Sequence, residues 1–298
     1  MGKINRPPVI YSPSSLQDLL RIYNLNKDAV IYAGGTWSLL NQEKEHFNMK
    51  GSVINIMAIE ELKKINRTDR YLELGAAVTV SRTLDLGKSI VPEALYQALK
   101  QLGPPQIRNM ATIGGNLCVS NSKMDLFPML HLHDAQIELK KQKDLRSPRR
   151  LLKGDSRWIP ASRFITSEGK TCLSPGEILT RIRIPNDSWE YQSYTKTGGI
   201  SSPLVFSGLA GTDKHILTDF RICFSTAKEK IIRNRDMEAD LIGRRLPFTR
   251  KEISHLNSKI TKIFQSVNET DFTTARAIAL TNQFIEKISL PIVDQVIF

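Results

Sequence analysis

The chain has 298 residues, of which 41% are hydrophobic and 24% are charged, a balance typical of a globular protein of one large or two smaller domains. This composition excludes a collagen-like, coiled-coil or intrinsically disordered chain. The formal net charge of +12 favours anionic partners, namely nucleic acid, phosphorylated cofactors or acidic protein surfaces, without choosing among them. No apolar run approaches the roughly 20 residues of a membrane helix, and the N-terminal residues contain no apolar signal core.

Three cysteines, Cys118, Cys172 and Cys223, lie far apart in the sequence. No pair has the C-x-x-C spacing of a zinc ribbon or an iron–sulfur cluster, and the set does not indicate a disulfide framework. Together with the missing signal core, these cysteines predict a reduced, cytoplasmic setting.

The N-terminal part of the chain is predicted to form one β–α unit. Ser14 or Ser15 can cap a first amphipathic helix. A short buried strand follows over residues 29–33. We then expect a helical turn over residues 37–41 and another strand over residues 53–56.

The middle of the chain is predicted to be α+β. In chain order, the pattern gives a strand over residues 71–75, a helix beginning at Thr79 or Ser81, a helix from Pro92 to about Leu102 that Gly103-Pro104-Pro105 stops, a helix over residues 125–133 and a strand over residues 136–140.

The last part of the chain changes character. An alternating strand over residues 179–184 ends at Pro185, and two strand-like runs follow over residues 191–197 and 216–224. From Ala227 onward the sequence is helical and charged almost to its end. Because strands are followed by helices, we expect a separate α+β domain that begins near residue 180.

Two glycine-containing turns carry the strongest chemical signal. Ala33-Gly34-Gly35-Thr36 directly follows a predicted strand, and Thr112-Ile113-Gly114-Gly115-Asn116 comes later in the chain. Glycine adopts positive φ and has no Cβ that would block a ligand, so each turn can direct backbone N–H groups at one anion. The side chains of Thr36, Ser38, Thr112 and Asn116 add donors. Two such turns can hold a pyrophosphate from both sides, although each Gly-Gly alone is also an ordinary tight turn.

Common nucleotide-binding and nucleophilic motifs are absent. No two glycines have the G-x-G spacing of the Rossmann motif. Gly169-Lys170-Thr171 is similar to the end of a P-loop, but Phe164 stands where that loop requires its first glycine. The sequence also contains no nucleophile–base arrangement, which suits a protein whose cofactor performs the chemistry.

The two turns resemble the FAD-binding motifs of the flavin subunit of molybdenum hydroxylases. This group includes the xanthine dehydrogenase flavin subunit and the medium chain of carbon monoxide dehydrogenase. Ala33-Gly34-Gly35-Thr36-Trp37-Ser38-Leu39-Leu40 is similar to the first motif, and Ala111-Thr112-Ile113-Gly114-Gly115-Asn116-Leu117 is similar to the second. The resemblance continues through Leu74-Gly75-Ala76 and through residues 173–179 and 181–185.

The resemblance implies an α+β fold with an FAD-binding domain of the vanillyl-alcohol-oxidase type, also termed PCMH-type. Such a domain has two α+β subdomains with FAD between them, and a small α+β C-terminal domain with an antiparallel sheet and helices follows. On this interpretation the FAD-binding domain covers residues 1–178, with subdomains of about 1–56 and 57–178, and the C-terminal domain covers residues 179–298.

The resemblance also implies, by position, which residues bind the cofactor. The first motif wraps the pyrophosphate, the second contacts the pyrophosphate and the ribityl chain, and two later residues lie near the flavin. The residues so implied are Tyr32, Ala33, Gly34, Gly35, Thr36, Trp37 and Ser38, then Thr112, Gly115, Asn116 and Asp125, and finally Leu179 and Lys196. Asp125 is equally suited to cap the helix that follows it.

The function implied is that of an FAD-dependent oxidoreductase subunit in a multi-chain molybdenum hydroxylase. A large partner would carry the molybdenum cofactor, a small partner would carry 2Fe–2S clusters, and FAD would pass electrons to NAD, a quinone-like acceptor or oxygen. The chain departs from the family after Lys196, where Thr197-Gly198-Gly199-Ile200-Ser201-Ser202-Pro203 replaces an Arg-Arg-x-x-Asp-type segment. This departure leaves the acceptor open, and it motivates one alternative, a flavin-free docking or assembly subunit on the same scaffold.

The remaining candidate residues have simpler interpretations. His131 and His133 are two positions apart on a predicted helix, so they point to different faces and are interpreted as structural rather than as metal ligands. The basic segments over residues 140–150 and 228–250 carry no aromatic residue before Phe248. We interpret them as solvated faces or as a docking surface for an acidic partner, and we expect no nucleic-acid partner.

Overall fold

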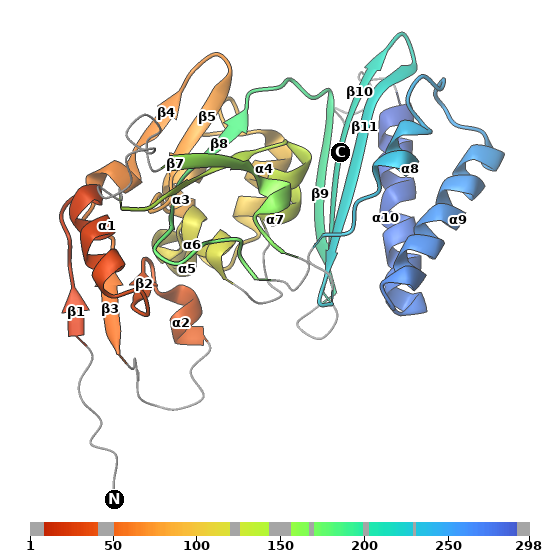
Figure 1. Ribbon diagram of the computed structural model, residues 1–298. Helices are drawn as coiled ribbons and strands as arrows, with labels where there is room; N and C mark the ends of the chain where they lie inside the picture. The colour runs from red at the N-terminus through yellow and green to blue at the C-terminus, as the bar shows by residue number, and fades with distance from the viewer. Residues whose placement is uncertain are drawn as a thin grey trace, which may run out of the picture. The chain divides into compact units, whose positions relative to one another are not determined.

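The computed structural model describes residues 9–40, 51–119, 126–142, 156–166, 170–198, 203–228 and 231–290 (Figure 1). It divides the chain into two compact units. Unit 1 comprises residues 1–91, 102–120 and 134–186, and unit 2 comprises residues 92–101, 121–133 and 187–298. Both units combine helices with strands.

Unit 1 begins with a small parallel sheet that packs against one helix. Its strand order is β1-β3-β2, with β1 at Val9–Tyr11, β2 at Val30–Tyr32 and β3 at Ser52–Asn55. The helix is α1 at Leu16–Leu25, and its N-cap is Ser15, whose side chain accepts a hydrogen bond from the N–H of Asp18. Leu19 of α1 and Ile54 of β3 are fully buried together in the core of this layer.

The second sheet of unit 1 has five strands in antiparallel pairs. Their order is β4-β5-β8-β6-β7, with β4 at Ile65–Arg67, β5 at Tyr71–Gly75, β6 at Gln136–Lys140, β7 at Ser156–Pro160 and β8 at Ile178–Pro185. Alternation along β8 buries Ile182 and Ile184, whereas Arg181 and Arg183 face the other way. Both guanidinium groups lie over the ring of Trp158, at 5.6 and 4.1 Å from its centroid.

A buried carboxylate connects β6 to β8. Glu138 is 2% exposed. Its carboxylate accepts hydrogen bonds from the Nε of Arg181 at 2.8 Å and from the hydroxyl of Thr180 at 2.7 Å. Burial by itself would raise the pKa of Glu138, but these donors and the charge of Lys140 outweigh it and lower the pKa to about 2.

Short helices complete unit 1. They are α2 at Thr36–Leu40, the 3-10 helix η1 at Glu60–Lys63, α3 at Val80–Leu84, α5 at Pro105–Met110, α6 at Ile113–Cys118 and the 3-10 helix η3 at Ala161–Arg163. The sequence pattern did not predict α5, because Gly103-Pro104-Pro105 was interpreted only as a helix stop. Pro105 instead begins a helix, where a missing N–H has no cost.

Unit 2 is a three-stranded antiparallel sheet packed against helices. The strand order is β11-β10-β9, with β9 at Tyr191–Thr197, β10 at Leu204–Asp213 and β11 at Ile216–Thr226. The helices are α4 at Glu93–Lys100, α7 at Phe127–Leu132, α8 at Arg235–Ala239, α9 at Arg250–Ser266 and α10 at Asp271–Ser289. Of the helices in the described part of the chain, none has both the length and the apolar character that a transmembrane span needs.

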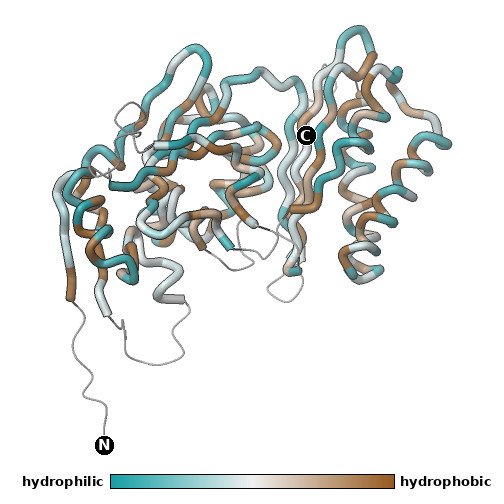
Figure 2. The backbone as a smooth tube through the Cα atoms, in the orientation of Figure 1, coloured by the Kyte–Doolittle hydropathy of each residue, from teal (hydrophilic) through white to brown (hydrophobic). Residues whose placement is uncertain are grey.

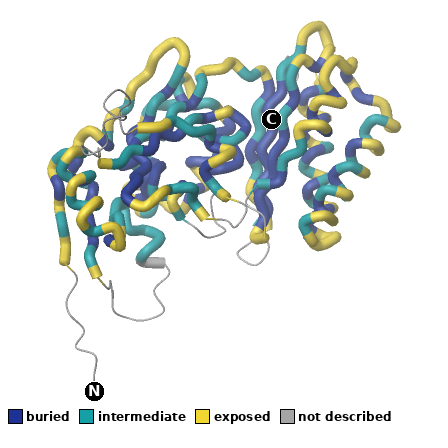
Figure 3. Tube along the Cα trace, viewed as in Figure 1, coloured by how far each residue is buried: buried dark blue, intermediate teal, exposed yellow. Residues whose placement is uncertain are grey.

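The central strand β10 is apolar and buried along most of its length (Figures 2 and 3). Leu204 and Phe206 join a core formed with α9 and α10. A Cβ on Gly208 would lie 2.8 Å from the ring of Phe284, so glycine at this position allows α10 to pack closely on the strand. Because β10 has no polar face, it lacks the alternation that predicts a strand, and the sequence pattern missed it.

The packing units differ from the predicted domain ranges, which stay a prediction. Helices α4 and α7 come from the N-terminal half of the sequence, but they pack on β9 and on β10 and β11 within unit 2. Strand β8 was expected to open the C-terminal domain, but its ladders with β5 and β6 place it in unit 1. In each case a contact between segments distant in the sequence decides the assignment.

A buried ion pair connects three elements of unit 2. The side chains of Arg233 and Glu238 are 7% and 5% exposed and lie 2.9 Å apart. Glu238 also accepts a hydrogen bond from the N–H of Ile222 at 2.9 Å, and Arg233 donates to the carbonyl oxygen of His131 at 3.4 Å. The pair therefore links α8, β11 and α7.

We expect Glu238→Gln to lower the free energy of unfolding by about 3 kcal/mol, because it leaves the buried Arg233 without a counter-charge. Urea denaturation at neutral pH measures the change. Glu286→Gln, at an exposed position of α10, is the control and should change the stability by less than about 0.5 kcal/mol. Equal effects of the two substitutions would contradict a structural role for the pair.

Glu138 makes the stability of unit 1 depend on pH in the acidic range. Its pKa of about 2 in the folded chain lies below the ordinary value of 4.5, so the stabilisation is complete above pH 4.5 and is lost as the pH falls from 4.5 towards 2. Glu138→Gln should therefore be about 2 kcal/mol less stable than wild type at neutral pH and should lose less stability on acidification. Urea titrations at decreasing pH test this, and parallel pH profiles of the two proteins would refute it.

Candidate functional site

The first glycine turn joins β2 to α2 and requires glycine at Gly35. This residue has a φ of +69°, a conformation that residues with a side chain rarely adopt. A Cβ built on Gly35 would lie 2.1 Å from the phenol oxygen of Tyr32. The tyrosine ring therefore fills the space that a side chain on Gly35 would need.

The second glycine turn opens α6 and lies beside the first turn in unit 1. A Cβ on Gly34 would lie 1.7 Å from the carbonyl oxygen of Met110 and 3.1 Å from the nitrogen of Ala111. Met110 ends α5, and Ala111 directly precedes Thr112, the N-cap of α6. Only a residue without a Cβ allows this approach, so Gly34 brings the two predicted turns together.

The backbone N–H groups of the second turn are occupied by the chain itself. The N–H of Gly114 donates to the carbonyl oxygen of Ala76 at 3.0 Å. The N–H of Gly115 donates to the hydroxyl of Thr112 at 3.1 Å, and that of Asn116 donates to the Thr112 carbonyl oxygen at 2.9 Å. The expectation that this turn presents its N–H groups to an anion is therefore not met, because helix capping and contact with residue 76 use them.

The first turn keeps its donors. Within the described ranges of the chain, the N–H groups of Gly34 and Gly35 have no hydrogen-bond acceptor. Both residues are half-buried, and backbone N–H groups removed from water are nearly always paired. Neighbouring N–H groups of a glycine turn form a concavity that binds anions, so these donors suit an acceptor-only group such as a diphosphate.

Asn116 has the opposite hydrogen-bonding character. It lies in the first turn of α6, and its Oδ1 is buried without a hydrogen-bond partner in the described part of the chain. An unsatisfied buried acceptor costs about 1–3 kcal/mol, which a ligand hydroxyl would recover. Donors on one turn and an acceptor on the other fit a ligand that combines a diphosphate with a polyol, as the pyrophosphate and ribityl parts of FAD do.

The other implied residues fall into two groups. Those in unit 1 are Thr36, Trp37 and Ser38, half-buried in α2, Thr112, which is 2% exposed, and Leu179, which is 3% exposed in β8. Helix α6 packs on β8, so Leu179 is on a strand next to the second turn. Lys196 is exposed on β9 in unit 2, and Asp125 lies outside the described residues.

One positioning contact near this site was not predicted. Glu177 is 6% exposed and accepts hydrogen bonds from the Nε and Nη2 of Arg157 and from the N–H of Ser174, all at 2.8 Å. Burial raises the pKa of Glu177, but the bonds from Arg157 and Ser174 outweigh it and lower the pKa. This contact holds the loop that leads into Leu179. The spacing of Ser174 and Glu177, three residues apart, was a local signal for the bond between them. The bond to Arg157 gave no such signal, because Arg157 is distant in the sequence.

No group of three or more histidine, cysteine, aspartate or glutamate residues that could hold a metal occurs in the described segments. The hydrogen-bonding groups assembled here, together with the apolar side chain of Leu179, are those that an organic phosphate cofactor requires. The site therefore has the character of a cofactor-binding site.

Comparison with known proteins agrees with this character. Residues 3–187 match the family described as FAD binding domain in molybdopterin dehydrogenase. The xanthine dehydrogenase FAD-binding subunit of Escherichia coli O157:H7 is 30% identical over 181 residues, which are 60% of this chain and 58% of that protein. Xanthine dehydrogenase 1 of Arabidopsis thaliana is 29% identical over 185 residues, which are 59% of this chain and 13% of that protein. The chain thus spans little more than half of the bacterial relative and a small part of the plant protein.

Solved structures share the fold. A chain of carbon monoxide dehydrogenase from Oligotropha carboxidovorans matches with a TM-score of 0.78 at 17% identity, covering 96% of this chain and 99% of that chain. A chain of quinoline 2-oxidoreductase from Pseudomonas putida 86 matches with a TM-score of 0.74 at 19% identity, covering 95% and 97%. These matches confirm the predicted α+β, PCMH-type fold.

The fold and the paired turns define an FAD-binding chain of the molybdenum hydroxylase class. The chain belongs to the family of FAD binding domains in molybdopterin dehydrogenases, and its cofactor is FAD. The donors of Gly34 and Gly35 and the orphaned acceptor of Asn116 fit this cofactor. Membership in an FAD-binding family favours a flavoprotein over the flavin-free alternative.

We expect Gly34→Ala to weaken FAD binding, because the added Cβ would overlap the Met110 carbonyl and push the two turns apart. Backbone shifts of this kind cost about 2 kcal/mol, so the dissociation constant of FAD should rise at least roughly tenfold. Fluorescence titration of the apo chain measures it. Gly211→Ala is the control, because its Cβ would meet only the Thr218 hydroxyl at 3.1 Å. Unchanged affinity of Gly34→Ala would show that the contact is dispensable.

Proposed function

We propose that this chain is the FAD-binding oxidoreductase subunit of a multi-subunit molybdenum hydroxylase of the xanthine dehydrogenase type. In this proposal, electrons come from iron–sulfur clusters on a partner and leave through FAD to NAD or another acceptor. The observation that carries the proposal is the meeting of the two glycine turns in unit 1. Within the described residues, the first turn has N–H donors without an acceptor and the second has a buried acceptor without a donor. The FAD-binding family and the xanthine dehydrogenase relatives support it.

Each part of the site has a role in this proposal. The N–H groups of Gly34 and Gly35 bind the diphosphate, and their bare Cα atoms let it approach the backbone. The Oδ1 of Asn116 accepts a hydrogen bond from a hydroxyl of the ribityl chain. Thr112 holds α6 in the orientation that directs Asn116, and Leu179 supplies an apolar wall that excludes water.

The redox chemistry belongs to the cofactor. FAD, when bound, exchanges electrons one or two at a time, which lets it connect one-electron carriers with a two-electron acceptor. The protein supplies position and charge. Lys196 is the residue we assign to the flavin edge, and its exposed ammonium would attract an anionic acceptor such as NAD.

The partner subunits complete the proposal. This chain contains no cysteine spacing for an iron–sulfur cluster. A molybdenum-cofactor large subunit and a 2Fe–2S small subunit are therefore expected on separate chains. Co-purification of these chains with the tagged full-length protein from its native host would test the assembly.

The cofactor role is tested with the purified full-length chain. We expect absorption bands at roughly 370 and 450 nm, as for an oxidised flavin. Asn116→Ala should raise the dissociation constant of FAD roughly tenfold, because about 1.4 kcal/mol of hydrogen bonding is lost. Fluorescence titration of the apo protein measures the affinity.

Asn282→Ala is the matched control for this experiment. Asn282 also has a buried Oδ1 without a partner in the described residues, but it lies on α10 in unit 2. Its loss should leave FAD affinity unchanged. A folded wild-type chain that takes up no FAD would end the proposal, and equal effects of the two asparagine variants would remove Asn116 from the site.

A further inference from the structure

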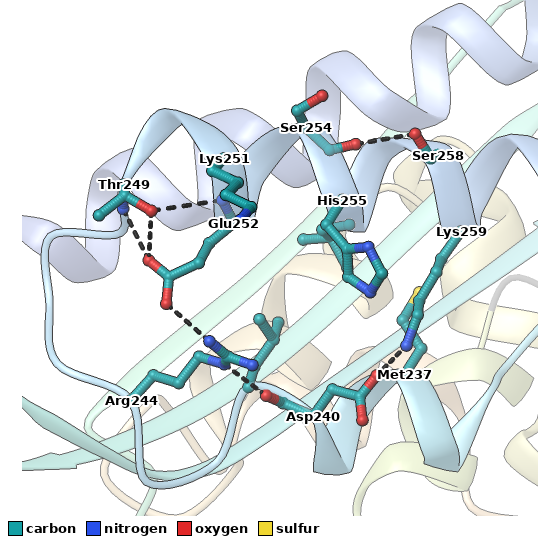
Figure 4. A pocket seen from close by; sticks show the side chains of 12 residues that line it. Met237, Asp240, Arg244, Thr249, Lys251, Glu252, Ser254, His255, Ser258 and Lys259 are labelled. Carbon is teal, nitrogen blue, oxygen red and sulfur yellow. Dashed lines mark hydrogen bonds and ion pairs between the residues drawn. The ribbon is translucent and has the colours of Figure 1, made fainter.

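A groove of unit 2 shares no residue with the candidate cofactor site. It lies between α8, the segment that follows α8, and the N-terminal half of α9, and has a volume of about 680 Å³ (Figure 4). This volume is within the range of roughly 300–1,000 Å³ that is usual for binding pockets. The groove is therefore large enough to receive several side chains of a bound segment.

The floor of the groove is apolar. Met237, Leu241 and Leu256 line it and are 3%, 5% and 2% exposed. Next to Leu241 in the chain, Ile242 is 44% exposed. An apolar side chain entering the groove would be removed from water against these residues, which stabilises binding.

The polar lining carries a net positive charge, with Arg244, Lys251 and Lys259 against Asp240 and Glu252. Two ion pairs, Arg244 with Glu252 at 2.8 Å and Lys259 with Asp240, neutralise the carboxylates of the lining, and the imidazole of His255 lies between them (Figure 4). Between residues 240 and 262 the sequence has six basic and two acidic residues. Arg245, Arg250 and Lys251 are exposed and make no ion pair in the part of the chain that the structure describes. These three side chains retain an uncompensated positive charge.

The chemistry of the groove distinguishes among anionic ligands. The capping box of Thr249 and Glu252 occupies backbone donors at the start of α9, so they are not available to a phosphate. Among the described lining residues there is no phenylalanine, tyrosine or tryptophan on which a nucleobase could stack. An apolar floor beside the unpaired ammonium of Lys251, with Arg245 and Arg250 close by in the chain, instead matches a peptide that carries both carboxylates and an apolar side chain.

We propose that this groove is a docking site for an acidic segment of a partner protein. An apolar side chain of the segment occupies the floor formed by Met237, Leu241 and Leu256, and its carboxylates face Lys251 and the neighbouring arginines. The proposal goes beyond the flavin function, because none of the residues that line the groove is among those assigned to the cofactor. It assigns part of the net charge of +12 to protein recognition.

The test uses the full-length protein and a fluorescent peptide of glutamates that flank a leucine–phenylalanine pair. Fluorescence anisotropy should show binding that weakens with salt. Lys251→Glu should weaken peptide binding by roughly fivefold or more, because the attraction between Lys251 and the peptide carboxylates becomes a repulsion. Ser254→Trp, which fills the groove from an exposed lining position, should abolish it. Lys27→Glu changes the net charge equally at an exposed position of unit 1 and should leave binding unchanged.

Several results would overturn the proposal. These are no binding by the wild-type protein up to about 1 mM peptide, equal weakening by Lys27→Glu and Lys251→Glu, and equal binding of a peptide with glutamine in place of glutamate. A wild-type dimer that Ser254→Trp dissociates in sedimentation would instead make a second copy the occupant. The groove variants should bind FAD with the affinity of the wild type. FAD titration of each variant therefore distinguishes a failure of the docking proposal from a failure of the flavin function.

Discussion

The contact between the bare Cα of Gly34 and the carbonyl of Met110 determines where the cofactor site can form. It holds the end of the parallel sheet against the start of α6. Helix α6 is held in turn by Gly114, whose N–H donates to the Ala76 carbonyl oxygen. The N–H of Ala76 donates to the carbonyl oxygen of Thr180 at 2.9 Å, next to Leu179. A continuous series of backbone contacts thus connects both glycine turns to strand β8.

The two turns contribute different chemistry although they are similar in sequence. In the second turn, capping and pairing with the segment after β5 consume the N–H groups, so its contribution is the side chain of Asn116. In the first turn, the N–H groups of Gly34 and Gly35 have no acceptor among the residues that the structure describes. A ligand with both phosphate oxygens and hydroxyl groups satisfies both turns, whereas a phosphate alone would leave the acceptor of Asn116 unpaired.

Charged side chains have two different environments in this protein. Inside each unit, buried carboxylates are matched with arginines, as in Glu138 with Arg181 and Glu238 with Arg233, and these pairs connect strands and helices. At the groove beside α9, basic side chains exceed acidic ones and remain exposed. The net positive charge does not by itself imply nucleic-acid binding, and residues 240–262 beside the groove, with six basic and two acidic residues, carry four of the twelve net charges.

The sequence by itself determined the features that depend on neighbouring residues. Local spacing predicted a cap at Ser14 or Ser15, a helix start at Thr79 or Ser81 and a strand over residues 71–75. The structure confirms these elements, with Ser15 and Thr79 as the caps. The family resemblance, carried by the same turns, is confirmed as well.

Only the tertiary structure decided the features that depend on distant residues. These are the burial of β10 on both of its faces, the contact of Gly34 with Met110, and the use of the second turn's N–H groups by Ala76 and by the Thr112 cap. The same holds for the packing of α4 and α7 in unit 2. The physical reason is that steric fit and hydrogen-bond competition between segments far apart in the chain leave no periodic trace in the sequence.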